Sequence, residues 1–305
     1  MASRSERVLI TGGTGFTGGR LAVQLRKSGH EVIALCLEGG APNTVTVDLR
    51  DFDGLERALL QTNPGAIVHL AGIAAPSHDK LDEIYSANVL GTANLFAALA
   101  ASKVKPRIVI VASSATVYAA GNADSPISED APLAPKSHYA ISKYATEQIA
   151  GIYSNHFQIT VVRPFNYTGP GQSSHFLVPK IVQHYAERRG EIRLGNLDLI
   201  RDFSDVERVT EAYARLLAPS IKPTTVNICS GRPIHLRSIL AMMEDLSGHR
   251  LKVVTEANFL REDEPRVVIG SPSRLEALVG ALPNPEFRET LRRMYDQTLE
   301  RRSAI

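Results

Sequence analysis

Tryptophan is absent from this chain and cysteine is almost absent, because Cys36 and Cys229 are its two thiols. Both have apolar neighbours, and neither belongs to a paired ligand motif, which excludes a disulfide framework and gives no basis for a zinc site or any other metal site. We therefore expect two reduced, buried packing residues in a cytoplasmic protein.

An excess of one charge is also missing, since 34 Lys and Arg residues stand against 32 Asp and Glu residues. This balance indicates no nucleic acid and no membrane surface as partner, so a small molecule is the expected ligand. Apolar runs are short, and none reaches the ~20 residues that span a bilayer. The polar N-terminus leads directly into the first strand-like run, so we expect neither membrane insertion nor a secretion signal.

Two kinds of pattern alternate along the 305 residues. Short runs rich in β-branched residues predict buried parallel strands at 8–10, 32–35, 67–70, 108–112, 160–162 and 226–228. Helical patterns lie between them, notably at 16–26, 81–101, 139–153 and 205–217. The alternation predicts an α/β fold with a doubly wound parallel sheet of the Rossmann type.

The alternation is interrupted at residues 169–200, and the segment after residue 231 is richer in charge, proline and loop signals. We expect these two segments to form a smaller α/β substrate lobe. The predicted domains are therefore discontinuous: residues 1–168 and 201–230 form the dinucleotide-binding domain, and residues 169–200 and 231–305 form the substrate lobe.

A glycine-rich turn follows the first strand and opens the first helix. Gly12 permits a tight turn, Gly15 lets backbone N–H groups approach a pyrophosphate, and Gly18 lets the helix pack closely on the strand. Phe16 and Thr17 begin that helix. An ordinary glycine turn is the alternative, but the strand before it and the helix after it favour dinucleotide binding.

The second strand ends in Cys-Leu-Glu at residues 36–38, with no carboxylate at its tip to bind a ribose 2′-hydroxyl. Basic residues are missing there too, so only Arg20 or Arg50 is available for a 2′-phosphate. Asp48 follows a short strand and is expected either at the adenine edge or as a turn residue. The remaining cofactor contacts are expected at strand ends: Leu49, Leu70, Ala71 and Gly72.

Tyr139 and Lys143 are spaced i, i+4 on a predicted helix. The same helix carries an apolar stripe, Ile141, Ala145, Ile149 and Ile152, which we take as its core face, with the pair on another face. The Lys143 ammonium would lower the pKa of the Tyr139 phenol and hold the cofactor ribose, and the phenol would exchange a proton with a reacting oxygen.

Ser114 lies just beyond the fifth strand, at the sheet edge where parallel-sheet enzymes place their sites. Its hydroxyl can hold and polarise a carbonyl, with Thr116 beside it as a second candidate. A serine cluster after a strand is often only loop chemistry, and Tyr-x-x-x-Lys is common by chance. The order glycine turn, Ser114, Tyr139 and Lys143 is far less common and indicates catalysis.

Together these motifs resemble the extended short-chain dehydrogenase/reductase family over essentially the full chain. Further matches are Asn-Val-Leu-Gly-Thr at 88–92, Ser-Ser-Ala-Thr-Val-Tyr at 113–118 and Arg-Pro-Phe-Asn at 163–166. The resemblance implies that Asn88 bends its helix and orders a proton-relay water; an ordinary polar residue within the helix is the alternative. It favours NADP as cofactor, with NAD as the other option. Ala119 departs from the glycine usual in the family.

Within that family the segments 163–172, 195–203 and 227–231 resemble enzymes that act on nucleotide-diphosphate sugars. The likeness implies contacts with a GDP-sugar from Asn166, Lys180, Asn196, Arg201 and Arg266. An arginine alone is more often a solvated surface residue, but a guanidinium suits a diphosphate because it donates two parallel hydrogen bonds.

The resemblance implies reduction of the C4 ketone of GDP-4-keto-6-deoxy-D-mannose to GDP-D-rhamnose, with GDP-6-deoxytalose as the C4 epimer. A 4-epimerase with retained NAD and a non-catalytic dinucleotide sensor are the alternatives. A 4,6-dehydratase is disfavoured because Ala115 and Thr116 stand where it would need an acid. The long helices at 81–101 and 139–156 also predict a homodimer through a four-helix bundle.

Overall fold

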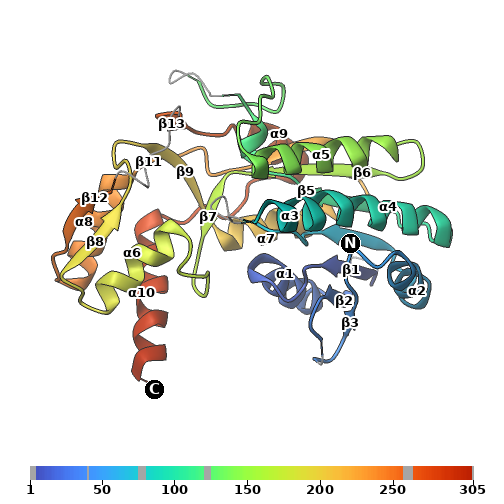
Figure 1. The fold of residues 1–305 in the computed structure, drawn as a ribbon, viewed down its shortest axis with the longest axis horizontal. Coiled ribbons are helices and arrows are strands. Elements are labelled where there is room, and N and C mark those ends of the chain that lie inside the picture. Colours follow the sequence, from blue (N-terminus) through green and yellow to red (C-terminus); the bar gives the residue numbers. More distant parts are fainter. Residues whose placement is uncertain (1–4, 40, 75–79, 120–124, 257–263, 304–305) are drawn as a thin grey trace.

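A seven-stranded parallel sheet forms the larger lobe of the computed structural model, which describes residues 5–39, 41–74, 80–119, 125–256 and 264–303 (Figure 1). The strand order is β3-β2-β1-β4-β5-β6-β10, and the order reverses between β1 and β4. This is the Rossmann arrangement, and it confirms the predicted fold class. The strands are β1 (Arg7–Thr11), β2 (Glu31–Cys36), β3 (Thr44–Thr46), β4 (Ala66–His69), β5 (Ile108–Ala112), β6 (Ile159–Pro164) and β10 (Thr225–Ile228).

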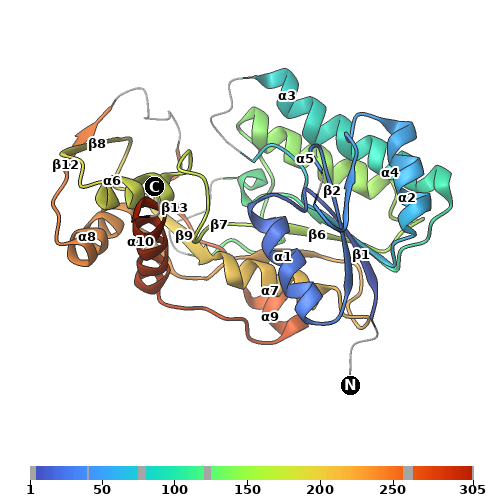
Figure 2. The same cartoon turned by 90° about the horizontal axis from the view of Figure 1, so that it is seen from below.

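Helices cover both faces of this sheet because alternate strand residues point to opposite sides. Val8 and Ile10 join the apolar core on one face, whereas Leu9 joins the core on the other. Figure 2 shows the sheet between the two helix layers. The first layer contains α1 (Phe16–Lys27), α7 (Val206–Leu216) and α9 (Ser273–Val279); the second contains α2 (Phe52–Thr62), α4 (Gly91–Ser102) and α5 (His138–Ile152). Of these, α2 and α9 were not among the predicted helices.

The helix predicted at 81–101 is continuous but irregular. It runs as α3 (Leu81–Tyr85), the π-helical turn η1 (Ser86–Leu90) and α4, and Asn88 is buried in the π turn. Its 22 residues are long and apolar enough to cross a membrane by length and composition, contrary to the expectation from sequence that no stretch is. In the structure it packs against α2 and α5, as the core helix of a globular protein does.

Helix α5 buries a different face from the predicted one. The apolar stripe was expected to face the core, yet Ile141 and Ile152 are exposed, at 41% and 72%. The buried face instead carries Lys143 and a row of small or polar residues: Ala140, Ser142, Thr146, Glu147 and Ala150. The predicted orientation is therefore wrong for Ile141 and Ile152, whereas Ile149 of the same stripe packs against the apolar core.

The described residues of the smaller lobe form two short sheets and three helices. Strands β8 (Glu191–Leu194) and β12 (Lys252–Thr255) pair in parallel, and β9 (Ile200–Asp205) pairs with β7 (Asn166–Thr168), β11 (Pro233–His235) and β13 (Val267–Val268). The helices α6 (Leu177–Ala186), α8 (Leu236–Ser247) and α10 (Phe287–Ser303) enclose a separate apolar core. The views in Figures 1 and 2 both show this lobe beside the carboxyl edge of the large sheet.

Buried carboxylates tie the two lobes together. Asp202 on β9 accepts hydrogen bonds from the backbone N–H groups of Ser230, Gly231 and Gly270, where the chain passes between lobes. Residues of α9 join the core of the large sheet although they follow residue 231. The domain division drawn from the sequence stays a prediction, and α9 is the segment that fits it least.

Candidate active site

One cavity of about 1800 Å³ runs from the glycine turn of the large lobe, past the carboxyl edge of the sheet, into the small lobe. Asn88 and Arg266 are not among the described side chains that line it. The predicted site residues that do are Gly12, Gly15, Phe16, Thr17, Gly18, Asp48, Leu49, Leu70, Ala71, Gly72, Ser114, Thr116, Tyr139, Lys143, Asn166, Lys180, Asn196 and Arg201.

The glycine turn has the shape that a dinucleotide pyrophosphate requires. Gly12 adopts a φ of +67°, and a Cβ there would stand 2.9 Å from the backbone of Ala71. Gly15 is the N-cap of α1, so no capping side chain bonds to the N–H groups of the first helical turn. These donors and the positive end of the helix dipole face the cavity, so the turn fits an anion.

At the adenosine end, Asp48 and Arg50 form a bidentate pair with the Arg50 Nε 3.0 and 2.9 Å from the two carboxylate oxygens. This bonding lowers the pKa of Asp48. Both residues line the cavity, so Arg50 is available to a 2′-phosphate. Arg20 does not line the cavity; its guanidinium lies 4.4 Å from the centre of the Phe16 ring and donates to the Pro170 carbonyl.

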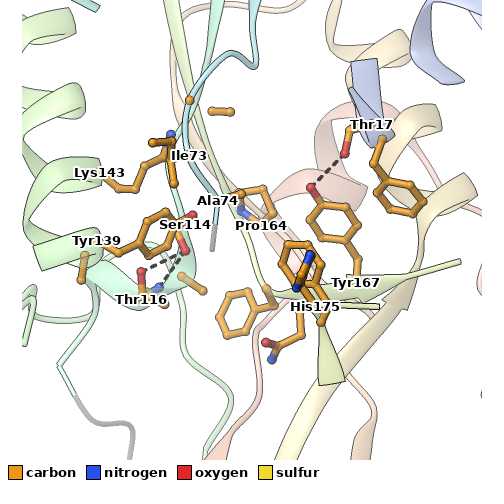
Figure 3. Close-up of a pocket in the computed structure, with 18 of the residues that line it drawn as sticks. Thr17, Ile73, Ala74, Ser114, Thr116, Tyr139, Lys143, Pro164, Tyr167 and His175 are labelled. Atoms are coloured by element: carbon orange, nitrogen blue, oxygen red, sulfur yellow. Dashed lines mark hydrogen bonds between the residues drawn. The ribbon is translucent and has the colours of Figure 1, made fainter. Parts of the chain in front are cut away.

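Tyr139 and Lys143 project from the inner face of α5 into the middle of the cavity (Figure 3). The expected lowering of the Tyr139 pKa by Lys143 is wrong: burial raises that pKa to about 12, although a hydrogen bond with Ser114 acts in the opposite direction. Burial lowers the pKa of Lys143 to about 8, while the charge of Glu147 opposes that shift. Near neutral pH the phenol therefore keeps its proton and most of the lysine keeps its charge.

Ser114 caps the short 3₁₀ turn η2 (Ala115–Val117) that follows β5. Its Oγ accepts hydrogen bonds from the Thr116 backbone N–H at 3.2 Å and from the Thr116 hydroxyl at 3.0 Å. Both bonds use the Ser114 oxygen as acceptor, and the hydrogen bond with Tyr139 places the Ser114 hydroxyl beside the phenol. Figure 3 shows Ser114, Thr116 and Tyr139 grouped on one side of the pocket.

Asn88 acts behind the cavity wall rather than on it. Its Oδ1 accepts from the Ile73 N–H at 2.8 Å, and its Nδ2 donates to the Ile73 carbonyl and to the Ser142 hydroxyl. Asn88 thereby fixes the chain after Gly72, where the cofactor contacts were predicted, and joins it to α5. The helix has a π turn at this position, whereas the implied bend and the proton-relay water stay predictions.

His69, at the end of β4, is a packed strand-end residue. Its ring nitrogens lie 2.7 Å from the Thr11 hydroxyl and 3.0 Å from the Thr92 hydroxyl. Burial, assisted by the charge of Lys143, lowers its pKa to about 3. The imidazole is therefore neutral at physiological pH.

The residues predicted to hold a sugar diphosphate are spread along the small-lobe half of the cavity. Arg201 pairs with Glu264 at 2.9 Å and donates to the Arg266 carbonyl. Lys180 donates to the Arg193 carbonyl at 2.9 Å, and Asn166 to the Asp202 carbonyl at 3.3 Å. Asn196 is exposed, its Oδ1 accepting from the Asp198 N–H. The backbone carbonyl of Arg266 accepts the hydrogen bond from Arg201, but Arg266 does not line the cavity. Its predicted role as a lining residue is therefore wrong.

Aromatic residues of the cavity were missed by the sequence reasoning. The Tyr167 hydroxyl lies 2.9 Å from that of Thr17, and its ring stacks on Phe16 with centroids 6.2 Å apart. His175, in the loop before α6, lies opposite Tyr139 (Figure 3). Tyr167 directly follows Asn166, so its place after a strand was a usable signal, whereas no local pattern distinguishes His175.

Comparison with known proteins identifies the family to which the chain belongs. The NAD dependent epimerase/dehydratase family model matches residues 8–229. The GDP-6-deoxy-D-talose 4-dehydrogenase of Aggregatibacter actinomycetemcomitans is 34% identical, over 90% of this chain and 91% of its own length. The GDP-6-deoxy-D-mannose reductase of Pseudomonas aeruginosa is 30% identical, over 94% and 95%. The solved structure of RMD from Pseudomonas aeruginosa complexed with NADPH superposes with a TM-score of 0.86 at 29% identity, covering 97% of this chain and all of that one.

Proposed function

The chain belongs to the NAD dependent epimerase/dehydratase family, and within it we propose that this protein reduces the C4 ketone of GDP-4-keto-6-deoxy-D-mannose to GDP-D-rhamnose, with NADPH preferred. The observation that carries the proposal is the order of groups along one cavity. A pyrophosphate cradle lies at one end, the hydroxyls of Ser114, Thr116 and Tyr139 lie in the middle, and the sugar-nucleotide half with Arg201 lies beyond.

The side chains of this protein can supply the proton that a carbonyl reduction requires. Bound NADPH supplies the hydride. Tyr139 donates its proton to the C4 oxygen, and Ser114 holds that oxygen with a hydrogen bond as negative charge develops. Thr116 orients the Ser114 hydroxyl through the two hydrogen bonds described above. Lys143 holds the cofactor ribose and favours the tyrosinate that forms when the proton leaves.

A 4,6-dehydratase needs an acid beside the catalytic hydroxyl, and the described lining carboxylates lie elsewhere. Ala115 and Thr116 follow Ser114. Among the described lining residues the carboxylates are Glu38, Asp48, Glu83 and Glu264, which lie at the adenosine end, on α3 or in the small lobe. This favours reduction over elimination.

The small-lobe half of the cavity has the chemistry for a GDP-sugar. Lys180 and Arg201 both line it, and each is fixed by a hydrogen bond to a backbone carbonyl. Pre-positioned cations lose little entropy on binding a diphosphate, so binding energy there can hold C4 against the catalytic hydroxyls. Asn166 and Asn196 supply amides for sugar and nucleotide groups.

The stereochemistry at C4 has two candidate outcomes. The relative from Pseudomonas aeruginosa is a GDP-6-deoxy-D-mannose reductase, whereas that from Aggregatibacter actinomycetemcomitans is a GDP-6-deoxy-D-talose 4-dehydrogenase. These products differ only in which face of the ketone receives the hydride. GDP-6-deoxy-D-talose is therefore the second candidate product.

The test is to generate the keto-sugar with a separate dehydratase, add this protein with NADPH or NADH, and identify the product by NMR. A large coupling between the axial protons H3 and H4 identifies the rhamno product, and a small one the talo product. Tyr139→Phe serves as the control for background reduction. Failure to consume the keto-sugar, together with interconversion of an unmodified UDP- or GDP-hexose without added reductant, would replace the reductase with an epimerase. Absence of all turnover would favour a dinucleotide sensor.

We also propose that the protein is a cytoplasmic homodimer in which the α3–α4 helix and α5 of each subunit form a four-helix bundle. Support comes from the exposed apolar side chains on these helices: Leu90 at 57%, Ile141 at 41% and Ile152 at 72%. Burying these apolar side chains between two copies would stabilise the pair.

A further inference from the structure

A buried ion pair lies directly behind the catalytic pair. Glu147 is one helical turn beyond Lys143 on α5, and its carboxylate accepts two hydrogen bonds from the Arg163 guanidinium, at 2.8 and 2.7 Å. Both side chains are only 7% exposed. Removing two charges from water is costly, and a core of apolar residues would serve stability as well or better, so the pair requires another reason.

Further hydrogen bonds hold the Glu147–Arg163 pair in place. The Ser113 hydroxyl donates to Glu147 at 2.5 Å, next to Ser114 on the loop after β5. Arg163 also donates to the Tyr118 hydroxyl and to the Glu129 carbonyl. Burial works against the charge of Arg163, yet its hydrogen bonds to Glu147 and Tyr118 leave its pKa raised. Glu147 thus has a permanent cationic partner.

We propose that Glu147 is a positioning residue for the reaction proposed above: it keeps Lys143 protonated in a buried site, while Arg163 and Ser113 hold the Glu147 carboxylate in place. The inference rests on the catalytic role of Lys143. Burial disfavours an ammonium ion, and the negative charge one turn away is the compensating influence on Lys143.

The other groups around Lys143 do not supply this charge. His69 on β4 is neutral, and Tyr139 keeps its proton. On β6 the charged residue is Arg163, which is cationic. The elements α4, η1, η2 and β5 that pack on α5 carry no titratable side chain. On α3 the acidic residues are Asp82, which is exposed, and Glu83, which pairs with Lys80 at 2.6 Å.

The test compares three folded variants by NMR titration of protein labelled at the lysine Cε, with the Lys143 signal assigned from Lys143→Met. In Glu147→Gln, which keeps the shape and removes the charge, we expect the pKa of Lys143 to fall by about one unit. Ser113→Ala removes a hydrogen bond to the same carboxylate but keeps its charge, so it should shift that pKa less than Glu147→Gln does. Glu244→Gln removes a carboxylate from a surface pair with Arg250 and is the control for general charge effects.

A second readout is the pH dependence of kcat at saturating cofactor. Glu147→Gln should move the alkaline limb to lower pH, with KM for the keto-sugar unchanged. If Glu147→Gln does not fold because Arg163 is left buried without its partner, the double variant Glu147→Gln, Arg163→Met removes both charges. The pKa of Lys143 should again fall in that variant. An unchanged Lys143 titration in the folded variant, or an equal shift in Ser113→Ala, would overturn the proposal. The titration needs no substrate, so it stands apart from any failure of the reductase assignment.

Discussion

Gly18 in α1 lies so close to the turn at Gly12 that a Cβ at position 18 would overlap the Gly12 carbonyl oxygen. At the next glycine, Gly19, a Cβ would make only ordinary van der Waals contacts, with the nearest atom 3.7 Å away. Two adjacent glycines of one helix therefore differ in what they permit, and this makes a matched pair for experiment.

Gly18→Ala should weaken NADPH binding by about tenfold or more, because relief of the clash moves the helix N-terminus away from the pyrophosphate. Gly19→Ala should bind normally and be slightly more stable, since alanine favours the helix. Titration of cofactor fluorescence measures both. Equal binding by the two variants would contradict the packing role of Gly18.

Tyr139→Phe should fold, bind cofactor and lose keto-sugar reduction by a factor of about 100 or more, because only the donor hydroxyl disappears. Lys143→Met should weaken cofactor binding as well as turnover. Single-turnover kinetics and cofactor titration separate the two effects. Near-normal activity in Tyr139→Phe would mean that another group is the proton donor.

Ser114→Ala should lower kcat by about 100-fold with little effect on cofactor binding, since a hydroxyl aimed at the developing oxyanion acts mainly in the transition state. Thr116→Val should cost less, because Thr116 acts by orienting Ser114. The double variant should be no worse than Ser114→Ala alone. Additive losses in this cycle of kcat measurements would instead assign Thr116 a direct contact with substrate.

His69 should make the fold sensitive to acid. Its folded pKa of about 3 lies below the ordinary value of 6.5, so the unfolded chain takes up the proton first as pH falls. Stability is fully present above pH 6.5 and should decline by about 1.4 kcal/mol per pH unit between 6.5 and 3 from this group. Denaturant unfolding of His69→Gln across that range should show a shallower slope. An unchanged slope would mean that His69 is not the titrating group.

Ile152→Asp should convert the proposed dimer into a folded monomer, because it puts a charge into the apolar surface of α5. Leu60→Asp on α2, where the side chain is 56% exposed outside the proposed bundle, is the control and should stay dimeric. Sedimentation velocity at micromolar concentration gives the answer. A monomeric wild-type protein would remove the bundle altogether.

The strands of the large sheet and the spacing of Tyr139 and Lys143 on one helix were predictable because each depends on a local signal. Val8 and Ile10 mark a buried strand by composition alone, and the spacing of Tyr139 and Lys143 defines one side of a helix. Glu147 continues that spacing by one more turn, so i, i+4 and i+8 could have indicated a common face. Its pairing with Arg163 joins residues from separate elements and has no local signature.

The orientation of α5 was the instructive error. Periodicity identifies a stripe but not what the stripe faces, and the rule that apolar residues point to the core fails where a helix covers a polar site. Ile141 and Ile152 face outward, while Lys143 and Glu147 are buried. The prediction for Arg266 was wrong for a different reason. The sequence places Arg266 near the site but does not show whether its side chain or only its backbone carbonyl makes a contact there.

The discontinuous course of the chain has a consequence for its biosynthesis. The edge strand β10 and the covering helices α7 and α9 emerge from the ribosome only after residues 177–199 of the small lobe. Until then the apolar surface of β6 that includes Val162 lacks its cover from Tyr213 and Leu275, which belong to the same core. The nascent chain must therefore carry an incomplete sheet through most of translation, and the two lobes should reach their native state together.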